Sequence, residues 1–410
     1  MLKGNCVIAQ SGGPTAVINN SLAGAIEAAY HGEAIGEIYG ARNGIMGVLA
    51  ENFIDLRRQD AATIQGLRFT PGAALGSCRY QLEKKEDYDK LLAIFRKFNI
   101  RYFFYIGGND SMDTAHKVNQ LAQEEGYELR VIGIPKTVDN DLPRTDHCPG
   151  YGSAAKYLAA SVLEMGMDIK SIVTSTKVAI VEAMGRNTGW LAAATALARR
   201  APGEAPHLIY LPEVAFDLDA FLADVETAYR QYGTVLVVVS EGLVDKNGNY
   251  IFNDAGTVDV FGHQRLGGLG QFLLNKIEAE LKIKGRFILP ATSQRSAMHL
   301  ASRTDAEEAY NVGRVAVEEA LRGASGHMVA IKRLEGEEYR CTYELVELDK
   351  VANQEKKVPR DWINAAGNDV TTDFINYARP LIQGEVNVPY HNGLPAYVNL
   401  AHQYPVKKCG

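Results

Sequence analysis

The chain has 410 residues, with 43 Lys and Arg against 49 Asp and Glu, and a formal net charge of −6. This length predicts two or three domains, and the shares of apolar residues (46%) and charged residues (22%) exclude a disordered, collagen-like or coiled-coil chain. The acidic balance argues against nucleic acid or an anionic membrane as a partner, because no excess of basic residues is present to neutralise phosphates.

Short β-branched and aromatic runs alternate along the chain with longer helical patterns, which predicts strands separated by helices. The predicted strands are residues 5–9, 101–106, 129–134, 177–181, 207–211, 234–240, 286–289 and 328–332. The helices that follow the first three strands are predicted at 15–30, at 111–124 and from about residue 150.

Apolar strands that alternate with helices are typical of parallel sheets covered on both faces. The sequence therefore predicts an α/β protein with two doubly wound, Rossmann-like domains. We expect these domains at residues 1–150 and 151–335, with the chain crossing between them, and a C-terminal extension over residues 336–410. Ligands in such folds bind at the carboxyl ends of strands, so the loops that follow the strands are the candidate sites.

The five cysteines are widely spaced and form no Cys-x-x-Cys pair, which is typical of reduced thiols. They are Cys6, Cys78, Cys148, Cys341 and Cys409. The apolar run at 6–9 is too short for a signal peptide, and the stretch around 235–239 is too short for a membrane helix. We therefore expect a cytoplasmic protein with no membrane partner.

Two glycine pairs follow predicted strands, Gly12-Gly13 and Gly107-Gly108. Glycines at such turns let backbone N–H groups approach a phosphate, and a helix N-terminus favours an anion. The functional interpretation is that both turns converge on one polyphosphate. Tight turns without a ligand are the alternative, and Asp110 could then be a helix N-cap.

The loop after the third strand, PKTVDND at 135–141, places a cation, a hydroxyl and two carboxylates within seven residues. One carboxylate can remove a proton from an attacking hydroxyl, and another can help to hold Mg²⁺. A lysine supplies a point charge for phosphate. These are the parts that phosphoryl transfer needs, whereas a solvated turn is the alternative interpretation.

Later strands are also followed by polar side chains. Met184-Gly185-Arg186 places a guanidinium where it could reach a phosphoryl oxygen, and Glu241 closes the strand 234–240 with a carboxylate suited to sugar hydroxyls. Arg286 and Arg295 flank one strand and its following loop; two such arginines are more often surface ion-pair residues.

Taken in order, these segments resemble the 6-phosphofructokinase family over roughly residues 4–335, and the tail is similar to that of its longer pyrophosphate-using bacterial members. The segments are Gly12-Gly13, GSCR at 76–79, GGNDS at 107–111, PKTVDND, Met184-Gly185-Arg186, Glu241 and Gln294-Arg295. The resemblance implies the phosphofructokinase fold, Mg²⁺ as cofactor, and reversible transfer of a phosphoryl group from pyrophosphate to the 1-hydroxyl of fructose 6-phosphate in glycolysis and gluconeogenesis. It also implies a homodimer or homotetramer, because a neighbouring subunit supplies part of the 6-phosphate clamp in this family.

The resemblance assigns roles to individual residues. The first domain would bind the phosphoryl donor, through Gly12, Arg79, Asp110 and Lys136. The second domain would bind the sugar phosphate. The substrate-binding residues would be Thr137, Asp139, Met184, Gly185, Arg186, Glu241, Arg286, Thr292 and Arg295, of which Arg286 and Arg295 would form the clamp on the 6-phosphate. Catalysis would rest on Asp139 as proton acceptor together with Arg186 and Lys136, and the metal would be held by Asn109 and Asp141.

Two positions bear on the donor, because ATP-using members typically carry Gly where this chain has Asp110 and Lys136. The Asp110 carboxylate would occupy space that the α-phosphate of a nucleotide needs. It would also repel that phosphate by about 1 kcal/mol in water, and by about 4 kcal/mol at an effective dielectric constant of 20. Pyrophosphate ends before that space. Because pyrophosphate lacks the contacts that a nucleotide makes, the positive charge of Lys136 would help to bind it.

The chain departs from the family pattern at two positions. Asn109 replaces a metal-binding Asp, and Thr292 replaces a ring-bearing residue near the 6-phosphate clamp. A second glycine-rich segment at 262–268 superficially resembles the clamp, and we interpret its His263 as structural.

Three other functions stay open. The first is the same reaction with ATP as donor, and the second is a non-catalytic sugar-phosphate sensor on the same fold. The third, a dinucleotide-dependent dehydrogenase, is disfavoured because no G-x-G-x-x-G opens a helix with an acidic residue about 20 positions later.

Overall fold

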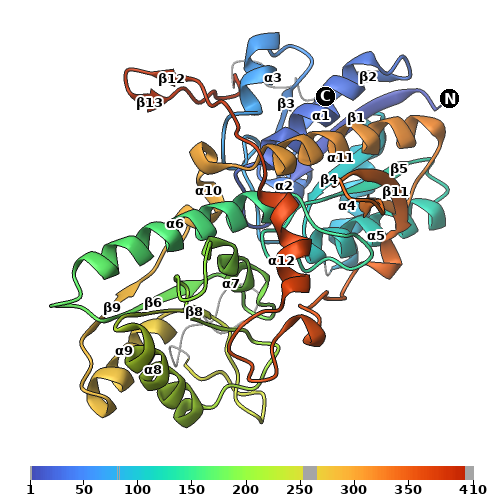
Figure 1. Ribbon diagram of the computed structural model, residues 1–410. Coiled ribbons are helices and arrows are strands. Elements are labelled where there is room, and N and C mark those ends of the chain that lie inside the picture. Colours follow the sequence, from blue (N-terminus) through green and yellow to red (C-terminus); the bar gives the residue numbers. More distant parts are fainter. Residues whose placement is uncertain (1, 81, 83, 253–265, 402–410) are drawn as a thin grey trace. The chain divides into compact units, whose positions relative to one another are not determined.

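The structure is a computed structural model that describes residues 2–80, 82, 84–252 and 266–401. Contacts divide the chain into two compact units (Figure 1). Unit 1 comprises Met1–Ser153, Arg295–Glu355 and Gly384–Gly410, and unit 2 comprises Ala154–Gln294 and Lys356–Gln383. His263 and Cys409 lie outside the described residues, and the four described cysteines form no disulfide with one another.

This division differs from the domain ranges expected from the sequence. Residues 295–335, which we expected in the second domain, belong to unit 1, because a helix and a strand from this stretch join the unit 1 core and sheet. The expected C-terminal extension is divided between the units, with 356–383 in unit 2 and the rest in unit 1. Local sequence patterns predict strands, but they do not say which sheet a strand joins.

Unit 1 contains a seven-stranded sheet in the order β11-β10-β5-β4-β1-β2-β3. The strands from β10 to β2 run parallel, and the two edge strands β11 and β3 pair antiparallel. The strands are β1 Gly4–Gln10, β2 Ile35–Ala41, β3 Phe53–Asp55, β4 Ile100–Gly107, β5 Arg130–Pro135, β10 His327–Arg333 and β11 Cys341–Glu347. A separate two-stranded hairpin consists of β12 Tyr390–His391 and β13 Leu394–Pro395.

Both faces of this sheet are buried, which explains the unbroken apolar pattern of its strands. On β1, Val7 and Ala9 pack with helices α2, α4 and α5, whereas Cys6 and Ile8 pack with α1 and α11 on the opposite face. Full burial of a larger apolar side chain such as Val7 or Ile8 contributes about 1.5–3 kcal/mol. The helices are α1 Ile18–His31, α2 Gly44–Leu49, α3 Ala61–Leu67, α4 Lys85–Lys97, α5 Asn109–Glu124 and α11 Arg303–Arg322. The short helix α10 Ser293–Ser296 includes the last residues of the unit 2 stretch that ends at Gln294 and the first of the unit 1 stretch that begins at Arg295.

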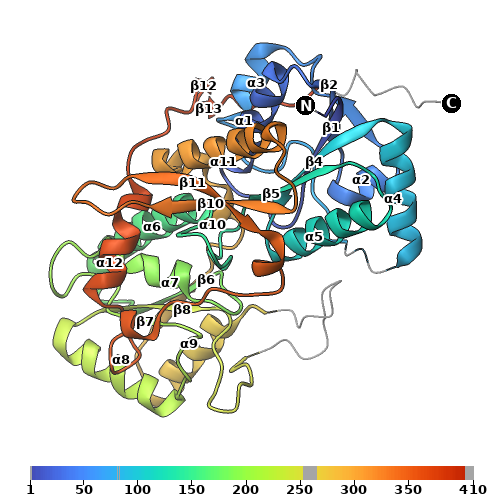
Figure 2. The same ribbon diagram turned by 90° about the vertical axis from the view of Figure 1, so that its right-hand side faces the viewer.

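The topology of unit 1 places a switch point between β1 and β4. These strands are neighbours, and the helices that follow them, α1 and α5, cover opposite faces of the sheet (Figure 2). In open α/β sheets, ligands bind at such a point beyond the carboxyl ends of the strands. Both predicted glycine turns follow these two strands.

Unit 2 contains a four-stranded parallel sheet in the order β7-β8-β6-β9. Helices α8 and α9 pack on one face, and α7 contacts the strands on the other (Figure 1). The strands are β6 Val178–Ala183, β7 Leu208–Tyr210, β8 Val235–Ser240 and β9 Gly285–Ile288. The helices are α6 Tyr151–Ser171, α7 Trp190–Ala194, α8 Leu218–Tyr232, α9 Leu269–Glu280 and α12 Thr372–Ala378. Short 3-10 helices cover Thr195–Ala198, Met298–Leu300, Leu348–Lys350, Arg360–Trp362 and Arg379–Ile382.

The predicted fold class is confirmed, and every predicted strand is present with ends that differ by one or two residues. Helix α1 begins at Ile18, three residues later than expected. The prediction left out β2, β3, β11 and the two short strands β12 and β13. Strand β2 carries two glycines, which weaken a strand pattern, and β11 is an edge strand of mixed polarity. No helix in the described part of the chain is long and apolar enough to span a membrane.

A buried imidazole ties the loop after β5 to α11. His147 Nδ1 lies 2.8 Å from Asp146 Oδ1, and its Nε2 lies 2.5 Å from Glu308 Oε2. Arg333 pairs with the same Asp146 carboxylate at 3.0 Å. Burial by itself would lower the pKa of His147, but the two carboxylates outweigh it and raise the pKa to about 9.

This imidazole makes the stability of the protein depend on pH. The pKa of His147 rises from 6.5 to about 9 on folding. Its stabilising contribution is therefore complete below pH 6.5 and is lost as the pH rises through about 9. We expect the free energy of unfolding to fall over this range in the wild type and to fall less in His147→Gln. Denaturant unfolding at several pH values tests this, and parallel profiles for the two proteins would contradict it.

Candidate active site

Three loops of unit 1 meet beyond the carboxyl ends of β1, β4 and β5. Ser77 Oγ donates to the carbonyl oxygen of Gly12 at 2.6 Å, which joins the turn that carries Arg79 to the first glycine turn. The Lys136 N–H donates to the carbonyl oxygen of Gly107 at 3.0 Å, which joins the loop after β5 to the second glycine turn. These two hydrogen bonds therefore bring together the turns and the loop that carry the predicted donor-binding residues.

Lys136 is the buried cation of this site, with only 3% of its surface exposed. A Cβ built on Gly12 would lie 3.0 Å from Lys136 Nζ, so the ammonium faces the glycine turn. Burial lowers the pKa of Lys136 to about 8, opposed by two carboxylates and assisted by two guanidinium groups. These charged neighbours are Asp139, Asp141, Arg295 and Arg79.

Arg295 belongs to this group of unit 1. Its guanidinium lies against the first glycine turn, because a Cβ built on Gly13 would be 2.7 Å from Arg295 Nη1. From the family resemblance we expected Arg295 to act with Arg286 on the substrate 6-phosphate. Its position beside Gly13 and Lys136 instead associates it with the predicted donor-binding residues.

Thr137 interacts with both carboxylate residues of the loop after β5, Asp139 and Asp141. Its Oγ1 accepts a hydrogen bond from the Asp139 N–H at 3.1 Å. Burial raises the pKa of Asp141, and a hydrogen bond from Thr137 opposes that rise. Asn140 adopts a positive φ of 54°, and its Oδ1 accepts from the Cys148 N–H at 2.9 Å. The loop is thus held on both sides of the half-buried Asp139.

Asp110 lies in the first turn of α5, and the N-cap is Gly108. The alternative that Asp110 is the N-cap is therefore wrong. A carboxylate in the first turn is favoured by the helix dipole. The N-terminus of α5 therefore already carries a negative charge. This charge weakens the attraction that a helix N-terminus would otherwise have for an anion.

Two buried oxygens of unit 1 suit a metal ion. Asn109 Oδ1 and Asp141 Oδ1 have no hydrogen-bond partner among the described residues. The Asn109 Nδ2 donates to the carbonyl oxygen of Gln354 at 2.5 Å, which fixes the orientation of the amide. Mg²⁺ prefers oxygen ligands and often binds through only one or two protein groups, so these two residues fit it. In the described part of the chain, no three His, Cys, Asp or Glu side chains gather as a metal cage.

In unit 2, the loop 184–189 follows β6 and precedes α7. The Met184 N–H donates to Gln294 Oε1 at 3.0 Å, and the Gly185 N–H donates to Glu241 Oε1 at 3.4 Å. Ser240 Oγ donates to the carbonyl oxygen of Gly185 at 2.6 Å. The structure thus brings Met184, Gly185 and Glu241 together at the adjacent carboxyl ends of β6 and β8.

The same loop carries Arg186. Its carbonyl oxygen packs directly on Gly242, where a Cβ would lie only 1.7 Å away. The Arg186 side chain is half-buried, and Thr292 is exposed in the loop after β9. Only glycine at position 242 leaves room for this path of the loop.

Arg286 lies elsewhere in unit 2. It aligns with Ala179 in the amino-terminal half of β6, whereas the loop 184–189 follows the carboxyl end of that strand. Its side chain is 44% exposed and pairs with Asp168 at 3.2 Å. The structure therefore does not bring Arg286 to the other predicted substrate residues of unit 2.

Sequence reasoning missed the side chains that hold the predicted residues in place. Ser77, Ser240 and Gln294 each bind the backbone of a residue that we had predicted. Ser240 and Gln294 are directly next to predicted residues in the sequence, and Ser77 lies two positions before Arg79. Ser77 and Gln294 also stand in segments that carry the family resemblance, but no role followed from it for them.

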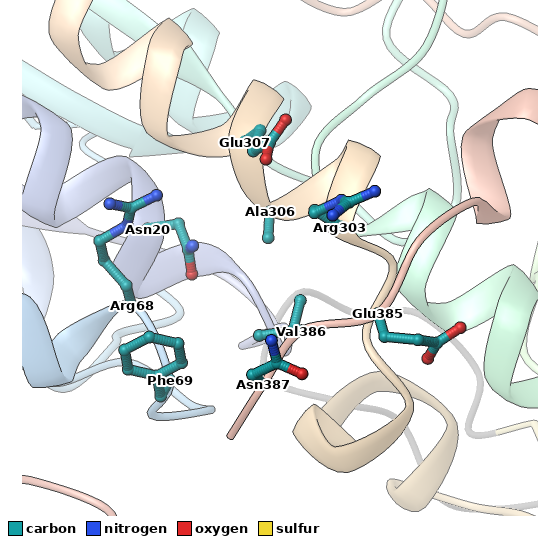
Figure 3. A pocket seen from close by; sticks show the side chains of 9 residues that line it. All are labelled: Asn20, Arg68, Phe69, Arg303, Ala306, Glu307, Glu385, Val386 and Asn387. Carbon is teal, nitrogen blue, oxygen red and sulfur yellow. The ribbon is translucent and has the colours of Figure 1, made fainter. Parts of the chain in front are cut away.

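Unit 1 also has a cavity of about 260 Å³ (Figure 3). It is lined by Asn20, Arg68, Phe69, Arg303, Ala306, Glu307, Glu385, Val386 and Asn387. None of the predicted site residues lines it, and its two arginines are matched by two glutamates. It therefore offers a phosphate no excess of positive charge.

Comparison with known proteins gives consistent matches. The family model described as Phosphofructokinase matches residues 5–319. The chain is 48% identical over 407 residues to a pyrophosphate--fructose 6-phosphate 1-phosphotransferase of Halomonas elongata, covering 98% of this chain and 97% of that protein. It is also 48% identical to a protein of the same name from Xanthomonas campestris pv. campestris, covering 100% and 99%. A crystal structure of the pyrophosphate-dependent phosphofructokinase of Marinobacter aquaeolei is similar with a TM-score of 0.91 and 45% identity, covering 99% and 98%.

Gly185 offers a direct test of the loop in unit 2. Its φ is +139°, and a Cβ there would lie 2.4 Å from the Thr188 carbonyl oxygen and 2.7 Å from Ser240 Oγ. We expect Gly185→Ala to displace the loop and to weaken binding of fructose 6-phosphate at least about tenfold, because small misplacements of binding groups are costly. Isothermal titration calorimetry measures this.

Gly233 provides the matched control in the same unit. It also has a positive φ, of +76°, but no described atom lies within 4 Å of a Cβ built there. Gly233→Ala should therefore carry backbone strain of about 1 kcal/mol without moving the loop. Equal affinity of the two variants for fructose 6-phosphate would rule out the assigned role of the loop.

Proposed function

The chain belongs to the phosphofructokinase family, and we propose that it transfers a phosphoryl group from pyrophosphate to the 1-hydroxyl of fructose 6-phosphate. The products are fructose 1,6-bisphosphate and phosphate. The observation that carries this proposal is the buried Lys136, which faces the Gly12 turn and has Arg79 and Arg295 among its charged neighbours. Such a cluster of cations at a switch point suits a short, highly charged donor.

In the proposed reaction, Asp139 accepts the proton of the 1-hydroxyl as the sugar oxygen attacks a phosphorus atom of pyrophosphate. The bond from that phosphorus to the bridging oxygen breaks, and phosphate leaves. Thr137 holds the backbone of Asp139 for this step. Lys136 and Arg186 neutralise charge on the phosphoryl group, since phosphoryl transfer depends mainly on positioning and electrostatic stabilisation.

On the sugar side, we assign Met184, Gly185 and Glu241 to the hydroxyls of fructose 6-phosphate. Their support is the hydrogen-bonded loop of unit 2. Thr292 retains a hydroxyl that can bond phosphate. Arg286 is exposed and lies away from these residues, and this supports a role in the site of a neighbouring subunit in a homodimer or homotetramer.

The choice of donor rests on Asp110 and Lys136. The Asp110 carboxylate in the first turn of α5 opposes the additional phosphate of a nucleotide, whereas pyrophosphate does not extend as far. Because pyrophosphate is a phosphoanhydride of modest energy, the reaction runs near equilibrium and serves both glycolysis and gluconeogenesis.

We also assign Mg²⁺ as cofactor, held by Asn109 and Asp141, whose buried oxygens lack hydrogen-bond partners within the described residues. When bound, the ion neutralises negative charge on the donor oxygens. An amide is a weaker ligand than a carboxylate, so we expect Asp141 to contribute more of the affinity. The described cysteines form no disulfide with one another, which supports a cytoplasmic location.

The donor assay tests this function. We expect purified protein with Mg²⁺ to convert fructose 6-phosphate rapidly with pyrophosphate and at least about a hundredfold more slowly with ATP, equivalent to about 2.7 kcal/mol. Initial rates with each donor at matched free Mg²⁺ decide between the two. Faster turnover with ATP would favour the ATP-dependent alternative, and no turnover with either donor would favour a sensor.

Asp139 tests the assignment of the base. We expect Asp139→Asn to lower kcat by about 10²- to 10⁴-fold and to leave the affinity for fructose 6-phosphate within about threefold, because the proton acceptor is lost but the shape is kept. Asp141→Asn is the matched control. Its activity should recover in part at high Mg²⁺, whereas Asp139→Asn should not recover. Near-normal kcat in Asp139→Asn would contradict the mechanism.

A further inference from the structure

The C-terminal segment 356–383 packs on the helix that follows the Arg186 loop. This segment is the part of the tail that belongs to unit 2. Trp190 opens α7, and its ring lies 6.2 Å from Trp362, 6.1 Å from Phe374 and 5.3 Å from Tyr377, measured between ring centroids. Its indole N–H also donates to the carbonyl oxygen of Lys356 at 2.9 Å. Figures 1 and 2 both show α12 beside α7.

One carboxylate joins this segment to the loop itself. Glu213 Oε1 accepts from the Gly189 N–H at 2.9 Å and from the Val358 N–H at 3.0 Å. Gly189 is the last residue of the loop 184–189, and Val358 belongs to the C-terminal segment. A single oxygen atom therefore bridges the two.

The other oxygen of this carboxylate is left without a partner. Glu213 Oε2 is buried and has no hydrogen-bond partner among the described residues. It faces the loop closely, since a Cβ built on Gly189 would lie 2.8 Å from it. Burial raises the pKa of Glu213, and the hydrogen bonds from Gly189 and Val358 oppose that rise. Because apolar groups of similar shape often replace buried charged groups without loss of stability, stability alone does not explain this carboxylate.

We propose that Glu213 is a positioning residue, which couples the C-terminal segment 356–383 to the loop 184–189 and thereby holds Arg186 in its working position. The loop is fixed at its start by Gln294, Glu241 and Ser240. Glu213 fixes its other end. Both ends of a short loop are then tied, so the segment between them keeps one conformation before the substrate arrives. This inference rests on the proposed function of Arg186.

The test compares Glu213→Ala with the wild type in steady-state kinetics. We expect kcat/KM for fructose 6-phosphate to fall about 10- to 100-fold, because Arg186 loses its fixed position. The KM for pyrophosphate should stay within about threefold, since the proposed donor residues belong to unit 1. Glu213→Gln keeps one acceptor oxygen without the charge, and we expect its kcat/KM for fructose 6-phosphate to lie between the values of the wild type and Glu213→Ala. If Glu213→Ala does not fold, Glu213→Gln replaces it in the comparison.

Asp224→Ala is the matched control. Asp224 Oδ2 accepts from Asn368 Nδ2 at 2.8 Å and from the Tyr210 hydroxyl at 2.8 Å. This carboxylate therefore also ties the C-terminal segment to unit 2, but no bond of it reaches the loop 184–189. We expect Asp224→Ala to lower the melting temperature as much as Glu213→Ala does, and to keep kcat/KM for fructose 6-phosphate within about threefold of the wild type.

The outcomes separate this inference from the proposed function. An active wild type with a selective loss of kcat/KM for fructose 6-phosphate in Glu213→Ala supports the positioning role. If kcat/KM for fructose 6-phosphate falls equally in Glu213→Ala and Asp224→Ala, in proportion to the loss of stability in each variant, the positioning role is overturned and the proposed function stays intact. An inactive wild type would overturn the proposed function. In that case calorimetry still tests the inference, because an affinity of Glu213→Ala for fructose 6-phosphate equal to that of the wild type would overturn the positioning role as well.

Discussion

The site of unit 1 depends on one buried cation. Burial holds the pKa of Lys136 near 8, well below its usual value of 10.5. Removing an ammonium from water costs several kcal/mol, and the neighbouring carboxylates Asp139 and Asp141 offset part of that cost. Arg79 and Arg295 work in the opposite direction. In the proposed function, the negative charge of a bound phosphate donor stabilises this ammonium. The burial that disfavours the charged form in the free protein would therefore favour binding of the donor.

The backbone around this cation leaves little freedom. Gly12 has a φ of +73°, and a side chain there would meet Lys136 Nζ at 3.0 Å. Neighbouring parallel strands bring the turns after β1, β4 and β5 together, and Ser77 adds the turn of Arg79 through one hydrogen bond. The acidic net charge of the chain is compatible with anion binding because a site depends on where its few cations lie rather than on their total number.

Much of the fold could be predicted from the sequence, because strands buried on both faces leave a continuous apolar pattern. The loops that carry the predicted residues could be found for the same reason, since they follow those strands. The pattern did not predict that α11 and β10 belong to unit 1, because local sequence does not encode which sheet an element joins. It also did not predict Arg295 beside Gly13, or Glu213 between Gly189 and Val358. These contacts join residues that are far apart in the chain, and only the folded backbone brings them together.

In the proposed function, the choice of donor rests on two charges, Asp110 and Lys136. The measurement that tests this most directly is the ratio of kcat/KM for pyrophosphate to kcat/KM for ATP, in the wild type and in the double variant Asp110→Gly with Lys136→Gly. Removal of the repelling carboxylate and of the buried ammonium should lower this ratio at least about a hundredfold, equivalent to about 2.7 kcal/mol, mainly through weaker use of pyrophosphate. Unchanged pyrophosphate kinetics in the double variant would contradict the account.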